Sequence, residues 1–228
     1  MSKATYEIIV KDDRLFFHDG KQYVLFDSGF APGSAAVDGK IGPFAVGRQS
    51  ACFFENFIKL TMEDGEKVTA VFNPMDGYDC LLEGGKLTVT DEEVEVPQCQ
   101  HFLEFVHPAL PILEGSLNGE QCRLFFDSGA RMTMLGEAPR GAKPSRTYRE
   151  WMAMLQHYAE LDVFPVTVSF PCGFQYDSEG ALVEDPPYRA AARMMKFRAV
   201  LGIDIFKHCD IFIAAKGKRR GIALLAKK

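Results

Sequence analysis

Short apolar runs separated by Gly, Asp, Asn and Pro dominate the 228-residue chain. Each run has the length of a strand, and Asp19-Gly20 and Asn118-Gly119 are typical of tight hairpin turns. This pattern predicts an all-β protein, built as a sandwich or barrel rather than from βαβ units. The expected strands cover residues 6–10, 14–17, 22–26, 57–62, 67–72, 79–82, 86–89, 112–117, 121–126, 163–170 and 197–201, with two more flanking 216–220.

One stretch, residues 145–161, carries a helical pattern instead. Its large apolar residues recur at intervals of three and four, and Ser145 stands where an N-cap would. This spacing predicts one amphipathic helix whose apolar stripe packs into the core. The stripe consists of Tyr148, Trp151, Met152, Leu155 and Tyr158.

An acidic stretch with three prolines, roughly residues 90–111, divides the pattern into two parts. It predicts a linker, residues 96–110, between an N-terminal lobe, residues 1–95, and a C-terminal lobe, residues 111–228. Each lobe contains the same sequence of features: a turn with glycine, an apolar strand and then Asp-Ser-Gly. The chain therefore contains an internal repeat, in which Asp27 and Asp127 lie 100 residues apart.

The repeated residue types suit a definite chemistry. Each Asp ends a strand, the following Ser supplies a hydroxyl that can brace the loop, and Gly allows a sharp turn. If the two lobes pack face to face, the two carboxylates meet and share one proton. The ionised carboxylate then takes a proton from water while the protonated one donates to a substrate carbonyl. This is amide hydrolysis by acid–base catalysis.

The repeat resembles the signature of the aspartic-protease superfamily, in both its retropepsin-like and pepsin-like branches. That signature is apolar-apolar-Asp-Thr/Ser-Gly-Ala/Ser, often with a hydroxyl residue a few positions later, and residues 124–133 are similar to it. The family's lobes also end in an apolar-apolar-Gly element that braces the Asp loop, and residues 199–206 resemble that element. The first copy departs from the signature, because Phe30 follows Gly29 and residues 1–95 contain no clean apolar-apolar-Gly element.

The resemblance implies an acid-protease-like fold of two β-barrel lobes, with Asp27 and Asp127 as the catalytic pair. Residues 57–72 fit either a flap hairpin over the cleft or an ordinary surface hairpin. The residues implied to support the two loops are Ser28, Gly29, Ser128, Gly129, Ala130, Thr133, Leu201 and Gly202.

The charge and the cysteines limit the partners and the cellular compartment that we expect for this protein. The net charge of −5, with mixed signs, gives no indication of a nucleic-acid or membrane partner. No apolar run reaches the ~18 residues of a membrane helix, and the N-terminus lacks a signal-peptide pattern. The six cysteines are scattered, without a C-x-x-C pair or a zinc-site spacing, which indicates reduced thiols in a cytoplasmic protein without a metal or cofactor.

The favoured function is an aspartic endopeptidase that cleaves peptide or protein substrates with Asp27 and Asp127, as a monomer or a homodimer. A second hypothesis is a homodimeric retropepsin-like protease that uses only Asp127 and its copy. A third is a non-catalytic protease-like scaffold that binds peptides or proteins. A glycosidase also needs two carboxylates, but it would not explain why both stand in repeated Asp-Ser-Gly turns.

Overall fold

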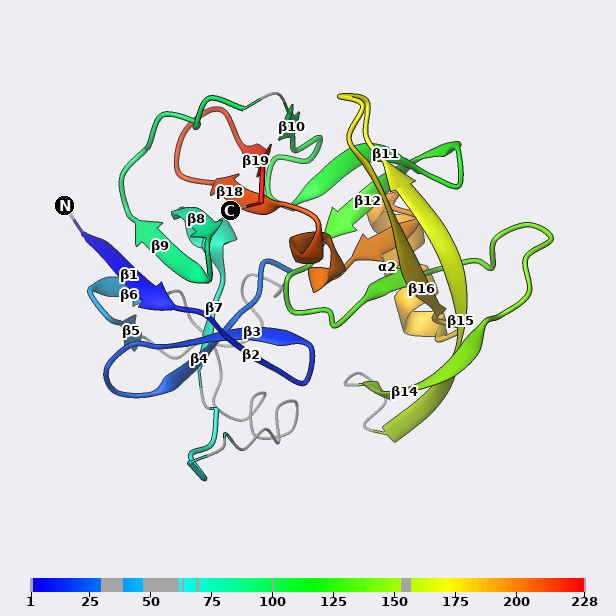
Figure 1. Cartoon of the computed structure of the whole chain (residues 1–228), viewed down its shortest axis with the longest axis horizontal. Coiled ribbons are helices and arrows are strands. Elements are labelled where there is room, and N and C mark those ends of the chain that lie inside the picture. The colour runs from blue at the N-terminus through cyan, green and yellow to red at the C-terminus, as the bar shows by residue number, and fades with distance from the viewer. Residues whose placement is uncertain are drawn as a thin grey trace.

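Strands dominate the computed structural model, which describes residues 2–29, 39–46, 62, 64–68, 70–99, 101–152 and 157–227. The predicted all-β class is therefore confirmed. Figure 1 shows the strands of the first 90 residues on one side and strands β11 to β16 on the other. Within the described residues, no helix is long and apolar enough to cross a membrane.

A six-stranded sheet joins the two halves of the chain, in the order β1-β9-β8-β18-β19-β10. The N-terminal half supplies β1 (Lys3–Glu7), β8 (Asp79–Glu83) and β9 (Lys86–Thr90), and the C-terminal half supplies β10 (His101–Glu104), β18 (Asp210–Ala214) and β19 (Gly221–Leu225). β8 pairs antiparallel with β18, where Leu81 lies opposite Phe212. The stretch predicted as a linker thus contributes β10, which pairs with β19.

A four-stranded sheet, β2-β3-β4-β7, carries the first Asp-Ser-Gly turn. Successive side chains of its strands point to opposite faces of the sheet. Phe16 and Leu25 lie in a small apolar cluster on one face, while Phe17 and Phe26 lie in the main core on the other. The elements of this region are β2 (Ile9–Lys11), β3 (Arg14–His18), β4 (Tyr23–Phe26), β7 (Ala70–Phe72), the two-stranded hairpin β5 (Gly39–Ile41) and β6 (Phe44–Val46), and the 3₁₀ helix η1 (Pro74–Asp76).

The C-terminal half forms a closed six-stranded barrel in the order β11-β12-β17-β13-β16-β15. The ring closes where β11 pairs with β15, and there the hydroxyl oxygens of Ser116 and Ser169 lie 2.6 Å apart. β14 extends the same sheet beyond β15. The elements are β11 (Ile112–Leu117), β12 (Glu120–Phe126), β13 (Thr133–Leu135), β14 (Arg146–Met152), β15 (His157–Ser169), β16 (Gln175–Leu182), β17 (Ala199–Leu201) and the 3₁₀ helix η2 (Ile203–Lys207).

The helix predicted for residues 145–161 is wrong. This stretch forms β14 and the first part of β15, which pair as an antiparallel hairpin from Arg146 opposite Val163 to Met152 opposite His157; residues 153–156 lie outside the described residues. Its aromatic residues favour strands as well as helices, and pairing within the barrel sheet decides between the two.

The α-helix described in the C-terminal half is α2 (Pro186–Met195), for which the sequence analysis predicted no element. Its N-cap is Asp185, whose side chain accepts a hydrogen bond from the Tyr188 N–H, and proline begins the helix, where its missing N–H is not needed. Lys196, in a left-handed conformation, ends it. Ala192 of this helix packs in a buried apolar cluster with Phe197, which lies shortly before β17.

Candidate functional site

Each Asp-Ser-Gly turn follows a strand that has a parallel neighbour. Asp27 follows β4, and its N–H donates to the Phe72 carbonyl at the end of β7, at 3.0 Å. Asp127 follows β12, and its N–H donates to the Leu201 carbonyl at the end of β17, at 2.9 Å. The two aspartates are therefore held in the same way by their two halves of the chain.

The two serines bind each other's turns. The Ser28 N–H donates to the Ser128 hydroxyl at 2.9 Å, and the Ser128 N–H donates to the Ser28 hydroxyl at 3.0 Å. The Ser28 hydroxyl in turn donates to the Phe126 carbonyl at 3.1 Å, and the Ser128 hydroxyl to the Phe26 carbonyl at 3.2 Å. Both serines are fully buried, so these four reciprocal bonds fix the two turns against each other.

The glycines let the two carboxyl groups meet. A side-chain carbon on Gly29 would lie 2.2 Å from the Asp127 carboxyl carbon, and one on Gly129 would lie 2.4 Å from that of Asp27. Each carboxyl group therefore rests against the glycine of the opposite turn. The Gly29 N–H donates to Asp27 at 2.9 Å, the Gly129 N–H donates to Asp127 at 2.8 Å, and the two carboxyl groups share a hydrogen bond.

Burial and close approach make the protonation of the two carboxyl groups interdependent. Burial raises the pKa of both, and the neighbouring Asp127 charge raises the pKa of Asp27 further. The hydrogen bond from Asp27 and the N–H groups of Gly129 and Ala130 counteract the rise in the pKa of Asp127. The two carboxyl groups therefore titrate as one coupled pair, which resists ionisation of both groups at once and favours the state with one shared proton.

A charged cluster crosses from one half of the chain to the other near this pair. Arg14 of β3 lies 3.7 Å from the Glu150 carboxylate of β14, and Arg131 lies 3.8 Å from the other oxygen of Glu150. The Tyr148 hydroxyl donates to Glu150 at 2.9 Å and accepts from Arg131 at 3.3 Å. Glu150 is 3 % exposed, and the positive charge of Arg14 also lowers the pKa of both aspartates.

The loop after Asp127 rests on the segment that follows β17. A side-chain carbon on Gly202 would lie 2.5 Å from the Met132 backbone, and the Ile203 N–H donates to the Ala130 carbonyl at 2.9 Å. The Thr133 hydroxyl donates to the buried Asp204 carboxylate at 3.0 Å, which ties β13 to η2. The residues predicted to support the second loop therefore all lie beside it.

The matching brace of the first half was missed by the sequence analysis. Residues 70–72 form β7 and stand beside Asp27 as β17 stands beside Asp127. The residue that follows is Asn73, not glycine, and η1 comes next as η2 does after Gly202. The available signal was an apolar run followed by Asn-Pro in place of the expected glycine. Phe30 lies outside the described residues, as do residues 57–61, 63 and 69 of the hairpin expected at 57–72.

No model of a known protein family matches this chain, and no curated protein matches it.

Proposed function

We propose that this protein is an aspartic endopeptidase with an acid-protease-like fold of two lobes, and that Asp27 and Asp127 of one chain form its catalytic pair. One observation carries the proposal: the two carboxyl groups share a hydrogen bond, and each lies against the glycine of the opposite turn. The five described cysteines are all free thiols, which agrees with a reducing compartment such as the cytoplasm.

The reaction needs only these two groups and one water. Asp127, as the anion, takes a proton from the water, whose oxygen bonds to the carbonyl carbon of the scissile amide. The carbonyl oxygen takes the proton of Asp27, which gives a tetrahedral diol. The diol then collapses: a hydroxyl proton returns to Asp27, the C–N bond breaks, and the leaving nitrogen takes the proton held by Asp127. Both carboxyl groups end in their starting states.

The experiment measures cleavage of a denatured protein from acidic to neutral pH. Activity is expected to be bell-shaped in pH, because it needs one carboxyl group ionised and one protonated. Asp27→Asn and Asp127→Asn should each lower kcat by about 10²–10⁴-fold, since an amide of the same shape cannot exchange the proton. Asp162→Asn, which removes an exposed carboxylate of β15, is the control and should leave kcat unchanged.

Two results would redirect the proposal. Normal cleavage by Asp27→Asn, with none by Asp127→Asn, would favour a homodimer that uses two copies of Asp127. If the folded wild-type protein cleaves nothing at any pH, the endopeptidase proposal is wrong, and a non-catalytic protease-like scaffold that binds peptides or proteins becomes the better reading.

A further inference from the structure

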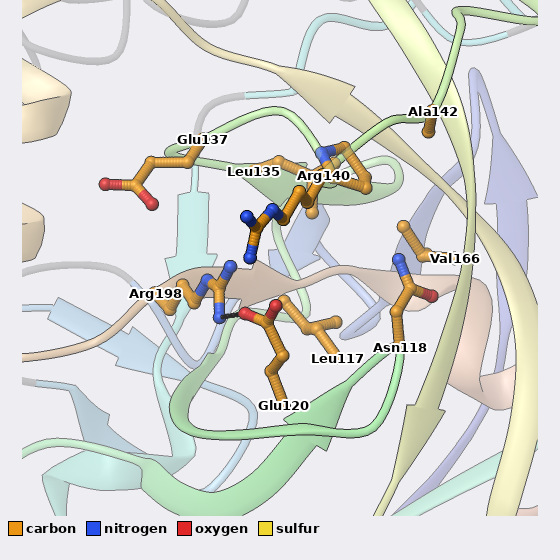
Figure 2. Close-up of a pocket in the computed structure, with 10 residues that line it drawn as sticks. Leu117, Asn118, Glu120, Leu135, Glu137, Arg140, Ala142, Val166 and Arg198 are labelled. Carbon is orange, nitrogen blue, oxygen red and sulfur yellow. Dashed lines mark hydrogen bonds and ion pairs between the residues drawn. The ribbon is translucent and has the colours of Figure 1, made fainter.

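A small cavity of about 170 Å³ opens on the C-terminal barrel. It lies between the β11–β12 turn, the loop after β13, β15 and the residue that precedes β17 (Figure 2). The two catalytic candidates do not line it. Its lining residues are Leu117, Asn118, Glu120, Leu135, Glu137, Pro139, Arg140, Ala142, Val166 and Arg198.

Two arginines meet at this cavity. Figure 2 shows the guanidinium groups of Arg140 and Arg198 pointing toward one another. Arg198 forms an ion pair with Glu120, and that contact raises the pKa of Arg198. Within the described part of the chain, no carboxylate lies within ion-pair distance of Arg140. Two cations that face each other repel, and an anion bound between Arg140 and Arg198 would relieve that repulsion.

Asn118 adds a hydrogen-bond donor. Its side-chain oxygen accepts the Thr167 N–H at 2.8 Å, and its own N–H donates to the Thr167 carbonyl at 2.9 Å. These two bonds fix the residue, which has a positive φ of 51°. Because the amide oxygen is already used, the NH₂ group is what Asn118 offers to a ligand.

Part of the cavity wall is apolar. Leu117, Leu135 and Val166 line it and are themselves at most 6 % exposed. Glu120 and Glu137 also belong to the lining, so its formal charges sum to zero. A phosphate, which has no apolar part and carries up to two negative charges, would meet these two carboxylates. A carboxylate, with one charge and planar geometry, matches a guanidinium fork and leaves its apolar body for the leucines.

We propose that this cavity binds the carboxylate of a small organic acid with an apolar body, about the size of one amino-acid residue. Two sources share this chemistry: a free apolar acid and the C-terminal residue of a peptide. The carboxylate lies between Arg140, the remaining N–H groups of Arg198 and the Asn118 amide. Its apolar part contacts Leu117, Leu135 and Val166.

The test follows the amide signals of residues 117–120 and 136–142 by NMR during titration of the full-length protein. N-acetyl-leucine, Ala-Ala-Leu, N-acetyl-leucinamide and inorganic phosphate are the probes. We expect N-acetyl-leucine to shift these signals, and its neutral amide to bind at least about tenfold more weakly, as the loss of one charge-assisted hydrogen bond implies. Binding of Ala-Ala-Leu at the same residues would assign the site to peptide C-termini, and binding of N-acetyl-leucine alone would assign it to free acids.

Arg140→Gln supplies the matched variant. Arg140 is exposed, so the variant is expected to fold, and it should weaken N-acetyl-leucine binding about tenfold. Arg193→Gln removes another exposed arginine, from α2, and should leave binding unchanged. Equal binding of the acid and its amide, shifts with phosphate alone, no shifts with any probe, or unchanged affinity in Arg140→Gln would each overturn the proposal. None of these measurements depends on peptide cleavage.

Discussion

Ser28 and Ser128 each use one hydroxyl both as a donor and as an acceptor across the boundary between the two halves of the chain. Both hydroxyls lie in fully buried surroundings, where a backbone group that loses its partner finds no water to replace it. The two serines therefore stabilise the site by satisfying backbone groups that the close approach of the turns would otherwise leave without a partner.

Replacement of Ser128 by alanine should show this role. The change leaves the Ser28 N–H and the Phe26 carbonyl without their partner, so the unfolding free energy should fall by about 2–4 kcal/mol in urea denaturation. Thr88→Ala, which removes an exposed hydroxyl contact with Thr5, should cost less than about 1 kcal/mol. Equal losses in these two variants would contradict the reciprocal role of the serines.

Arg14 has a separate, electrostatic consequence. Its positive charge favours the ionised forms of Asp27 and Asp127 and so lowers the pKa of both. Arg14→Met should therefore raise both pKa values and move both limbs of the pH–activity profile to higher pH. Carbon-13 NMR titration of the two carboxyl groups measures the same shift without any cleavage, and Arg193→Met is the control. A profile that changes only in height would mean that Arg14 acts through packing alone.

Among the elements, β13, β16 and η2 meet at one buried carboxylate. Asp204 of η2 accepts the Thr133 hydroxyl at 3.0 Å and the Ser178 hydroxyl at 2.6 Å. Burial raises the pKa of Asp204, so the folded protein resists its ionisation. The contribution of Asp204 to stability is thus full below its unfolded pKa of about 3.9 and declines as pH rises through its folded pKa.

Asp204→Asn removes this pH dependence. The amide keeps an oxygen that can accept both hydroxyls but carries no charge, so the variant should be more stable than the wild type at neutral pH. The difference should shrink as pH falls toward about 4, where the wild-type carboxyl group is protonated. Thermal unfolding at neutral and acidic pH checks this expectation. A variant that is less stable than the wild type at neutral pH would indicate that the charge is needed there.

Some of the strands could be predicted from the sequence, and others could not. Strands such as β3 and β12 were predicted because a short continuous apolar run bounded by turn residues is typical of a strand that is buried on both faces. The β14–β15 hairpin was not, because Glu150 is buried in it by partners from distant elements, which no local pattern reports. The two Asp-Ser-Gly turns were found because they repeat. β7 lies within the strand predicted at residues 67–72, but its role beside Asp27 was not predicted, because Asn73 takes the place where a glycine was expected.

At the scale of the molecule, the six-stranded sheet could not be foreseen, because it pairs strands from opposite ends of the chain. A chain that ends before β17 lacks the strand whose Leu201 carbonyl holds Asp127, and it also lacks β18 and β19. We expect residues 1–197 expressed alone to show no cleavage and no cooperative unfolding transition in circular dichroism. Cleavage by this fragment at the wild-type rate would contradict the role given to the C-terminal strands.

The dependence of the first aspartate turn on the second has a consequence for biosynthesis. Ser28 gains its backbone partners only when the turn at Ser128 reaches it, and Asp127 gains its own only when Leu201 has been added. A ribosome makes the chain from its N-terminus, so the contacts that hold Asp27 against Asp127 are complete only when nearly the whole polypeptide has emerged. Under the proposed function, we expect peptide cleavage to begin only from that point.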